Sequence, residues 1–277
     1  MQRRWYQYRL RILLLVFLMV CASWVVVRMH RAWRQKEAVE AVCESGLEVD
    51  YESWLPQHLA DVVAVGIDHA AMDRGVVITD ASLEHIEEFS RLRTLNLGGG
   101  DNRITDVGLI HLEGLTNLKT LYLDGDGITG RGLMHLKGLT KLEVLSLIGA
   151  KVTGVELVCL KEMPRLRALD LAATPVDDAG LEHIGKLTQL GWLDLHFTNI
   201  TDAGLVHLKG LTNLRTLNLS YTNITDVGLV HLKGLTQLES LTVWAGRVHG
   251  ESLLRVKGVR NPEKSKDFST KVTDAVG

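Results

Sequence analysis

Histidine recurs at a regular spacing along this chain, and histidine is the side chain that most often binds zinc. The recurring positions share one register, with a cysteine at one of them: His85, His111, His135, Cys159, His183, His207 and His231. Zinc holds its nitrogen ligands about 2.0–2.1 Å away, whereas neighbouring helices pack about 8–10 Å apart. A column with one ring per helix therefore cannot close a regular series of zinc sites. The pattern predicts rings that pack between helices or bond to carbonyl groups, and no metal.

The other reactive residue types form no catalytic pattern. Gly98–Gly100 lacks the lysine and hydroxyl residue that complete a phosphate-binding loop, and the chain has no nucleophile elbow or zincin motif. Asp177 and Asp178 precede a predicted helix, which they are expected to cap. The cysteines have no paired spacing and are expected to be unpaired thiols: Cys21, Cys43 and Cys159. We therefore predict no enzyme activity, cofactor or metal.

A repeat of 24 residues positions all of these side chains. Leu214–Thr236 is one complete unit, and the unit that begins at Leu92 has 26 residues because of an insertion in Gly98–Arg103. Val62–Phe89 has the same strand and helix spacing and counts as a further first unit, which makes eight. The regular units begin at Leu118, Leu142, Leu166, Leu190, Leu214 and Leu238. A fixed period of this size indicates stacked supersecondary units.

Each unit reads as a strand, a turn and a short helix. Leu217 and Leu219 alternate as inward residues of a strand do, and Thr222 stands in the turn, where its side chain is expected to bond to backbone. Thr225 and Asp226 are residue types that cap helices. The following leucines share one helical face: Leu229, Leu232 and Leu235. The predicted fold class is α/β: a leucine-rich repeat solenoid, an arc with parallel strands on its concave face.

The string ITDxGLxHLKGLTxL, present as Ile200–Leu214 and Ile224–Leu238, resembles the leucine-rich repeats of planctomycete bacteria. It is also similar to the repeats of eukaryotic F-box proteins. The resemblance covers residues 62–261 and implies the repeat fold. Two units depart from the string, because Gly130 and Gly154 replace the aspartate and Glu156 replaces the following glycine. A local distortion of the turn is expected there.

The charge is divided unevenly along the chain. Residues 1–36 contain eight Lys or Arg and no acid, which leaves 23 basic and 33 acidic residues in the remainder, a net charge of −10. An acidic body is a poor partner for nucleic acid, whose binding depends on neutralising phosphates. The basic end instead surrounds an apolar run and is typical of a membrane-proximal segment.

That run predicts a membrane anchor at residues 10–27. Ile12–Val27 has no charged residue, and with Leu10 and a snorkelling Arg11 it spans about 27 Å, enough for a bilayer core. A cleaved signal peptide is the alternative, but the run continues into Arg28 without a small-residue cleavage site. Four Lys or Arg flank each side, so the orientation is open, with a slight preference for extracytoplasmic repeats.

The resulting organisation has four parts. Residues 1–36 hold the anchor, 37–61 form an N-terminal cap, 62–261 are the repeats, and 262–277 are a polar tail. Residues 33–44, which continue or follow the anchor, are expected to be helical. In the cap, Leu47–Tyr51 is expected to be a strand and Trp54–Pro56 an irregular plug. The order of basic start, apolar span and repeats resembles one group of membrane-anchored planctomycete repeat proteins.

The outward strand positions carry the candidate site. Aromatic, acidic and amide side chains from three successive repeats meet there, a composition typical of protein-contact hot spots: Trp192, Asp194, His196, Phe197, Asn218, Tyr221 and Trp244. The predicted function is a membrane-anchored module that binds a protein or peptide partner on its concave face. A structural or self-associating envelope scaffold is the alternative. An F-box-like adaptor in protein turnover is a further one, although residues 1–61 show no F-box-like helical segment.

Overall fold

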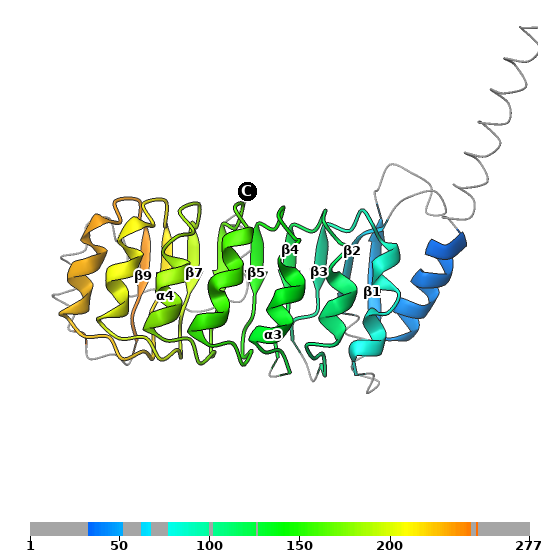
Figure 1. The fold of residues 1–277 in the computed structure, drawn as a ribbon, viewed down its shortest axis with the longest axis horizontal. Coiled ribbons are helices and arrows are strands. Elements are labelled where there is room, and N and C mark those ends of the chain that lie inside the picture. Colours follow the sequence, from blue (N-terminus) through cyan, green and yellow to red (C-terminus); the bar gives the residue numbers. More distant parts are fainter. Residues whose placement is uncertain are drawn as a thin grey trace, which may run out of the picture.

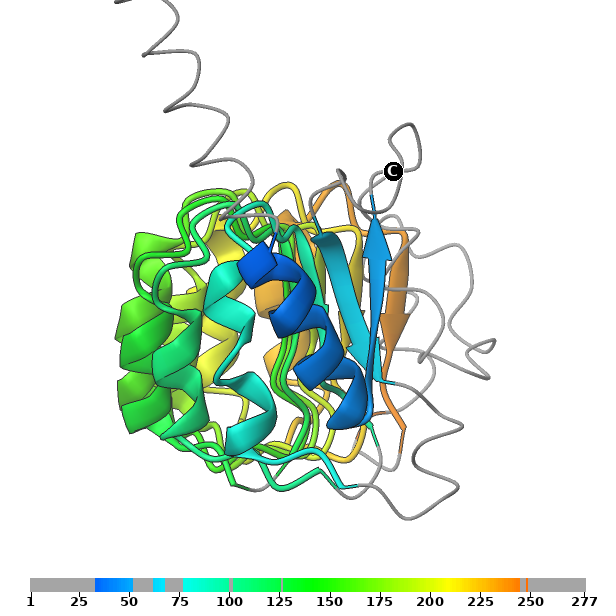
Figure 2. The same cartoon turned by 90° about the vertical axis from the view of Figure 1, so that its right-hand side faces the viewer.

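In the computed structural model the strand–helix units stack side by side in one elongated row (Figure 1). The structure describes residues 33–51, 62–67, 77–99, 102–125, 127–244 and 248. The helices cover one face of a single sheet and leave the other face to the strands (Figure 2). The leucine-rich repeat solenoid that the sequence predicts is confirmed for this part of the chain.

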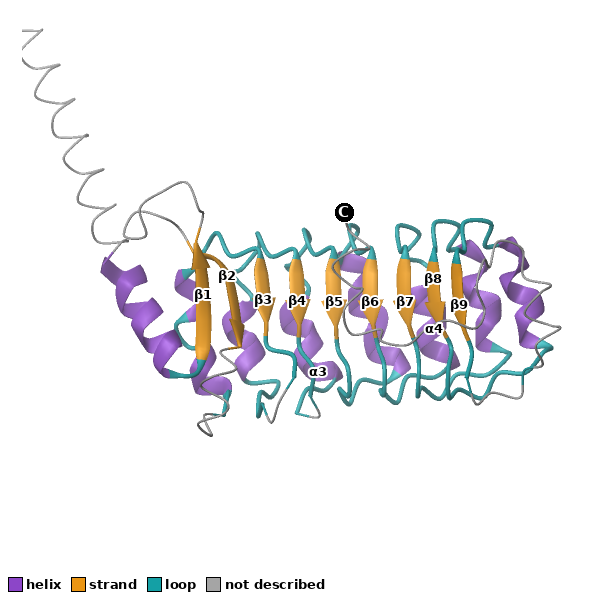
Figure 3. Cartoon of the chain, turned by 180° about the vertical axis from the view of Figure 1, so that it is seen from behind, coloured by secondary structure: helices purple, strands orange, loops and turns teal. Residues whose placement is uncertain are grey.

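The strands pair in chain order, β1 to β9. β1 runs antiparallel to β2, and every later pair is parallel (Figure 3). Equivalent leucines are in register, as where Leu193 pairs with Leu217 and Leu217 with Leu241. The bounds are β1 Leu47–Tyr51, β2 Val62–Ile67, β3 Thr94–Asn96, β4 Thr120–Tyr122, β5 Val144–Ser146, β6 Ala168–Asp170, β7 Trp192–Asp194, β8 Thr216–Asn218 and β9 Ser240–Thr242.

The helices are short, and most are 3₁₀ rather than α. A 24-residue unit leaves room for one or two turns, the length at which the tighter 3₁₀ helix is common. The 3₁₀ helices are η1 Asp80–Leu83, η2 Ile86–Glu88, η3 Gly108–Leu112, η4 Met134–Leu136, η5 Gly154–Glu162, η6 Gly204–Gly210 and η7 Gly228–Gly234. Two α-helices lie within the part of the repeats that the structure describes, α3 Gly130–Leu133 and α4 Asp178–Ile184. Residues 33–44 are also helical, as predicted.

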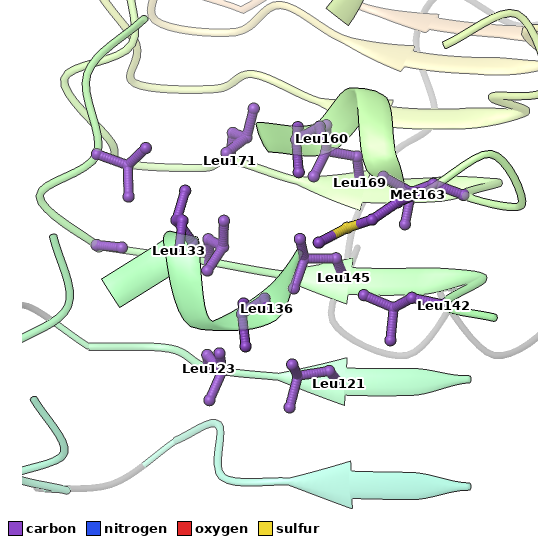
Figure 4. Packing of buried hydrophobic residues seen from close by; sticks show 14 of the residues in the cluster. Leu121, Leu123, Leu133, Leu136, Leu142, Leu145, Leu160, Met163, Leu169 and Leu171 are labelled. Atoms are coloured by element: carbon purple, nitrogen blue, oxygen red, sulfur yellow. The ribbon is translucent and has the colours of Figure 1, made fainter. Parts of the chain in front are cut away.

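The core is one continuous column of leucines between the sheet and the helices. Leu121, Leu145 and Leu169 come from successive strands, and Leu136 and Leu160 come from the helices that face them (Figure 4). Each of these five side chains has no exposed surface. Because every unit shares its core with its neighbours, burial is continuous along the row.

The N-terminal end of the row is covered by the segment predicted to cap it. Ala38 and Val42, from the helical residues 33–44, are buried with Leu47 in the core. β1 then pairs along β2, whose edge it covers. The predicted plug Trp54–Pro56, the predicted anchor at 10–27 and the tail at 262–277 lie outside the described residues. None of the helices in the described ranges combines the length and apolar character needed to cross a bilayer.

An aspartate–threonine clamp joins most neighbouring units. Asp202 accepts hydrogen bonds from the Thr225 backbone N–H at 2.8 Å and from its hydroxyl at 2.5 Å. The same pair of bonds joins Asp80 to Thr105, Asp106 to Thr129, and Asp178 to Thr201. These aspartates therefore bridge to the next unit and do not cap their own helices. The capping role expected for this aspartate position is wrong, because the next unit offers two donors.

The other turn positions behave as the sequence predicts. The hydroxyls of Thr174, Thr198 and Thr222 each donate to the carbonyl three residues earlier, at 2.6 Å. Asp177 caps α4 by accepting the Gly180 N–H at 3.3 Å. The backbones of the unit that begins at Leu142 and of the next unit come close here, since Gly154 and Gly180 lie against each other.

Candidate partner-binding face

The strand face is the face of the sheet turned away from the helices (Figure 3). Three of the predicted site residues expose large aromatic side chains at its edge, where the strands end. Phe197 is 54% exposed, Tyr221 48% and Trp244 54%. We call these three residues the aromatic ridge.

The ridge is ordered by ring stacking and by backbone hydrogen bonds. The Phe197 and Tyr221 rings stack with centroids 4.3 Å apart and planes 6° from parallel. The His196 ring meets Phe197 edge-on at 5.4 Å. The Tyr221 N–H donates to the Trp244 carbonyl at 2.8 Å, which continues the strand ladder past β8. The rings therefore present a preformed apolar surface.

The stacked residues occupy an unfavourable backbone conformation. Phe197 has φ 53° and Tyr221 has φ 56°, in the left-handed region. Gly125, Gly149 and Ala173 hold the equivalent position in earlier units, also with positive φ. A side chain with a Cβ costs about 1–2 kcal/mol in this region relative to glycine. Two bulky aromatics at a position suited to glycine point to a role that stability alone does not explain.

A buried polar network lies beneath the ridge. Asp194 accepts from the His196 backbone N–H at 2.9 Å and from the Asn218 amide at 2.9 Å. The Asn218 side-chain oxygen accepts the Ser220 N–H at 3.1 Å, and the Ser220 hydroxyl oxygen accepts the Trp244 N–H at 3.1 Å. Asp194 is 2% exposed and Asn218 6%. These two residues thus hold the loops that carry the ridge, and the expectation that they face solvent is wrong.

Trp192 is also buried, with 3% of its surface exposed. It packs with Ala168 and Val144, the residues in register on the two preceding strands, and with Tyr122. The expectation that Trp192 is exposed is therefore wrong, because its side chain packs in this cluster.

Burial changes the acid–base behaviour of this face. The pKa of Asp170 is raised to about 7 by its burial and then by the charge of neighbouring Asp194, although the Ala172 N–H bond acts the other way. The hydrogen bond to Asp194 raises the pKa of His196. Asp170 was not among the predicted site residues. Asp170 lies in the same strand column as Asp194 and pairs with it in register. That position is the sequence signal by which Asp170 could have been included in the predicted site.

The histidine column has no metal-binding geometry in the part of the chain that the structure describes, where no three metal-binding side chains come together. His111, His135, His183 and His231 are half-buried, whereas His85 and His207 are exposed. His135 instead bonds to the Glu113 carboxylate at 2.6 Å. Cys159 fills its place in the column as a buried free thiol, and burial raises its pKa to about 11.

Comparisons with known proteins agree with this architecture. A family described as "Leucine rich repeat" matches residues 188–243, and one described as "Leucine Rich repeats (2 copies)" matches residues 90–130. Among solved structures, internalin C2 from Listeria monocytogenes matches with a TM-score of 0.55 and 21% identity, over 82% of this chain and 92% of that chain. A search of curated proteins gives no match. The planctomycete and F-box resemblances are not shown by these comparisons. The repeats, the sheet and the matched families together establish that this chain is a leucine-rich repeat protein.

Proposed function

We propose that this protein is a membrane-anchored interaction module that binds a protein partner at the aromatic ridge of its strand face. The observation that carries the proposal is the stacked, exposed pair Phe197 and Tyr221, held in a left-handed conformation that glycine fills elsewhere. Large aromatics are the residues that most often dominate protein interfaces. Leucine-rich repeat proteins in general bind protein partners, which supports the same function.

The network below the ridge supports binding without a large rearrangement. Asp194, Asn218 and Ser220 connect three successive units by hydrogen bonds. Their burial keeps these bonds from competing with water. A partner would therefore meet rings already in place, so little conformational entropy would be lost on binding.

Membrane attachment is the second part of the proposal, and it rests on the sequence. Residues 10–27 combine an apolar run with basic flanks and lack a cleavage site for a signal peptidase. A slight preference for extracytoplasmic repeats follows from the short basic N-terminus. Extraction of the protein from membranes only by detergent, with its N-terminus intact, is the expected result. Recovery of a chain that begins beyond Val27 would contradict the anchor.

The binding test compares full-length proteins purified in a neutral detergent. The ridge variant is Phe197→Gly with Tyr221→Gly, because glycine suits the backbone at both positions. The control is Val227→Ala, an exposed apolar residue (72% exposed) outside the ridge. Proteins retained by the parent and the control, but not by the ridge variant, are the expected partners. For a purified partner, the loss of an aromatic anchor should weaken affinity by roughly thirtyfold.

Two results would count against binding at the ridge. Equal retention of the same proteins by parent and ridge variant would show that the ridge is ordinary surface. Recovery of this chain alone, with self-association unchanged in the ridge variant, would favour the scaffold function instead.

A further inference from the structure

A hollow lies at the N-terminal ends of β3 and β4, far along the row from the aromatic ridge. Its volume is about 820 Å³, within the range of small-molecule sites. Four of its lining residues are basic and none is acidic: Arg91, Arg93, Thr94, Asn117, Lys119, Thr120 and Lys141. The hollow is therefore a concentration of positive charge.

Hydrogen bonds between units fix the backbone that carries these side chains. The Lys119 and Thr120 N–H groups both donate to the Arg93 carbonyl, at 2.8 and 3.0 Å. Thr94 and Thr120 pair in register on β3 and β4. The Asn117 amide donates to the Ser90 carbonyl at 2.9 Å. Hydrogen bonds to the neighbouring unit therefore hold the backbone from which these basic side chains extend.

The lysines keep donors available for a ligand. Lys141 Nζ donates to Asn117 Oδ1 at 2.7 Å, and Lys119 Nζ lies 3.0 Å from the Glu143 carboxylate. Both side chains are exposed. An ammonium group has three donors, so each of these contacts leaves hydrogen-bonding capacity unused.

The positive charge of the hollow contrasts with the acidic balance of the repeats. The residues outside the N-terminal segment carry a net charge of −10. At the positions equivalent to Arg91 and Arg93, the unit that begins at Leu166 also has two arginines, Arg165 and Arg167. The last three units have mostly neutral residues there, and their one arginine, Arg215, bonds to Glu239 at 3.3 Å. The equivalent residues are Gln189, Gly191, Asn213, Arg215, Gln237 and Glu239. Basic residues at these two positions are therefore more frequent in the units up to the one that begins at Leu166 than in the last three units.

We propose that this hollow binds a phosphate ester, through the lysines and arginines that line it. A phosphate presents several oxygen acceptors and more than one negative charge, which several cations can share. Guanidinium groups bind it in a two-pronged geometry, and ammonium groups bind it as point charges. The phosphate can belong to a soluble small molecule or to a phospholipid headgroup, and both have the same chemistry at this site.

Inorganic pyrophosphate is the probe for the site. Its binding to the full-length protein in neutral detergent is measured by equilibrium dialysis. The site variant is Lys119→Gln with Lys141→Gln. The control is Arg215→Gln, which removes a positive charge at the position equivalent to Lys119 but outside the hollow. We expect saturable binding to the parent and the control, and a loss of roughly tenfold or more in affinity for the site variant.

Absence of saturable pyrophosphate binding to the parent would overturn the proposal. An equal loss in Arg215→Gln and in the site variant would overturn it too, since the effect would then come from overall charge. Competition by micelles that contain phosphatidylglycerol, but not by neutral micelles, would identify the headgroup as the source. Competition by neither micelle, with pyrophosphate binding intact, would identify a soluble ester. None of these outcomes depends on the aromatic ridge.

Discussion

The Glu156 side chain occupies the space that Gly130 leaves empty on the preceding unit, where a Cβ would overlap it. In the regular units the position of Gly130 holds an aspartate, and its carboxylate lies against a glycine at the position of Glu156 in the next unit, as Asp106 lies against Gly132. Here the acidic residue and the glycine have exchanged places. The Thr153 backbone N–H donates to the Glu156 carboxylate at 2.9 Å, and its hydroxyl donates to the same oxygen. The clamp on this threonine is thus supplied from its own unit.

This exchange predicts strong coupling between the two positions. Gly130→Asp alone should clash with Glu156, and Glu156→Gly alone should leave Thr153 without its carboxylate. Each change should reduce the free energy of unfolding by about 1–3 kcal/mol. The double variant should recover at least about 1 kcal/mol, because the introduced carboxylate would meet Thr153 as Asp106 meets Thr129 at 2.6–2.7 Å. Chemical denaturation measures the cycle, and additive losses in the double variant would disprove the exchange.

Ala173→Gly should stabilise the protein. Ala173 is exposed and has φ 55°, which glycine adopts without strain. The gain should be up to about 1 kcal/mol after the entropy of the glycine is subtracted. Ala203→Gly is the matched control, because Ala203 has φ −65° and should lose about 0.5–1 kcal/mol. Thermal melts compare the two, and a loss of stability in Ala173→Gly would contradict the strain at this position.

Asp170→Asn should change the pH dependence of stability. The pKa of Asp170 is raised to about 7 in the folded protein from its ordinary value of 3.8. The folded protein therefore keeps a proton that the unfolded chain has lost between about pH 4 and 7, so this group lowers stability as the pH rises through that window. Asparagine is neutral throughout and can still accept the Ala172 N–H bond.

We expect Asp170→Asn to raise the melting temperature at pH 8 and to leave it nearly unchanged at pH 4. The raised pKa of His196 acts in the same direction, since its stabilisation is present at low pH and is lost as the pH rises through its folded pKa. The charge of Asp170 also contributes to the raised pKa of His196, so the difference between parent and variant includes a smaller contribution from this histidine. An equal difference at both pH values would show that Asp170 does not titrate in this window.

Leu217→Ala should destabilise the middle of the array. Leu217 has no exposed surface and belongs to the continuous core. Removing such a side chain typically costs about 2–5 kcal/mol, because the cavity does not fully collapse. Val227→Ala, at a side chain 72% exposed, should cost less than about 0.5 kcal/mol. Denaturation of both variants tests the core assignment, and similar losses in the two would refute it.

The sequence by itself determined the repeat, the strands and the buried leucines. Leu217 and Leu219 are buried as their alternation predicts, because alternate side chains of a strand point to the same side of the sheet, and here that side faces the helices. The turn threonines, such as Thr198, could also be predicted, since their bonds are local. Phe197 and Tyr221 were correctly predicted to be exposed from their strand columns.

Tertiary structure alone decided the contacts between units. The aspartate position was predicted to cap its own helix, yet Asp202 bonds to Thr225, which lies one unit further along the chain. Trp192 and Asp194 stand at outward positions but are buried. Trp192 packs with side chains on the preceding strands, and Asp194 accepts a hydrogen bond from Asn218 on the next strand. The periodic pattern gives the face on which a residue lies. What occupies the space beside that residue depends on side chains 24 residues away, and only the stacked units bring those together.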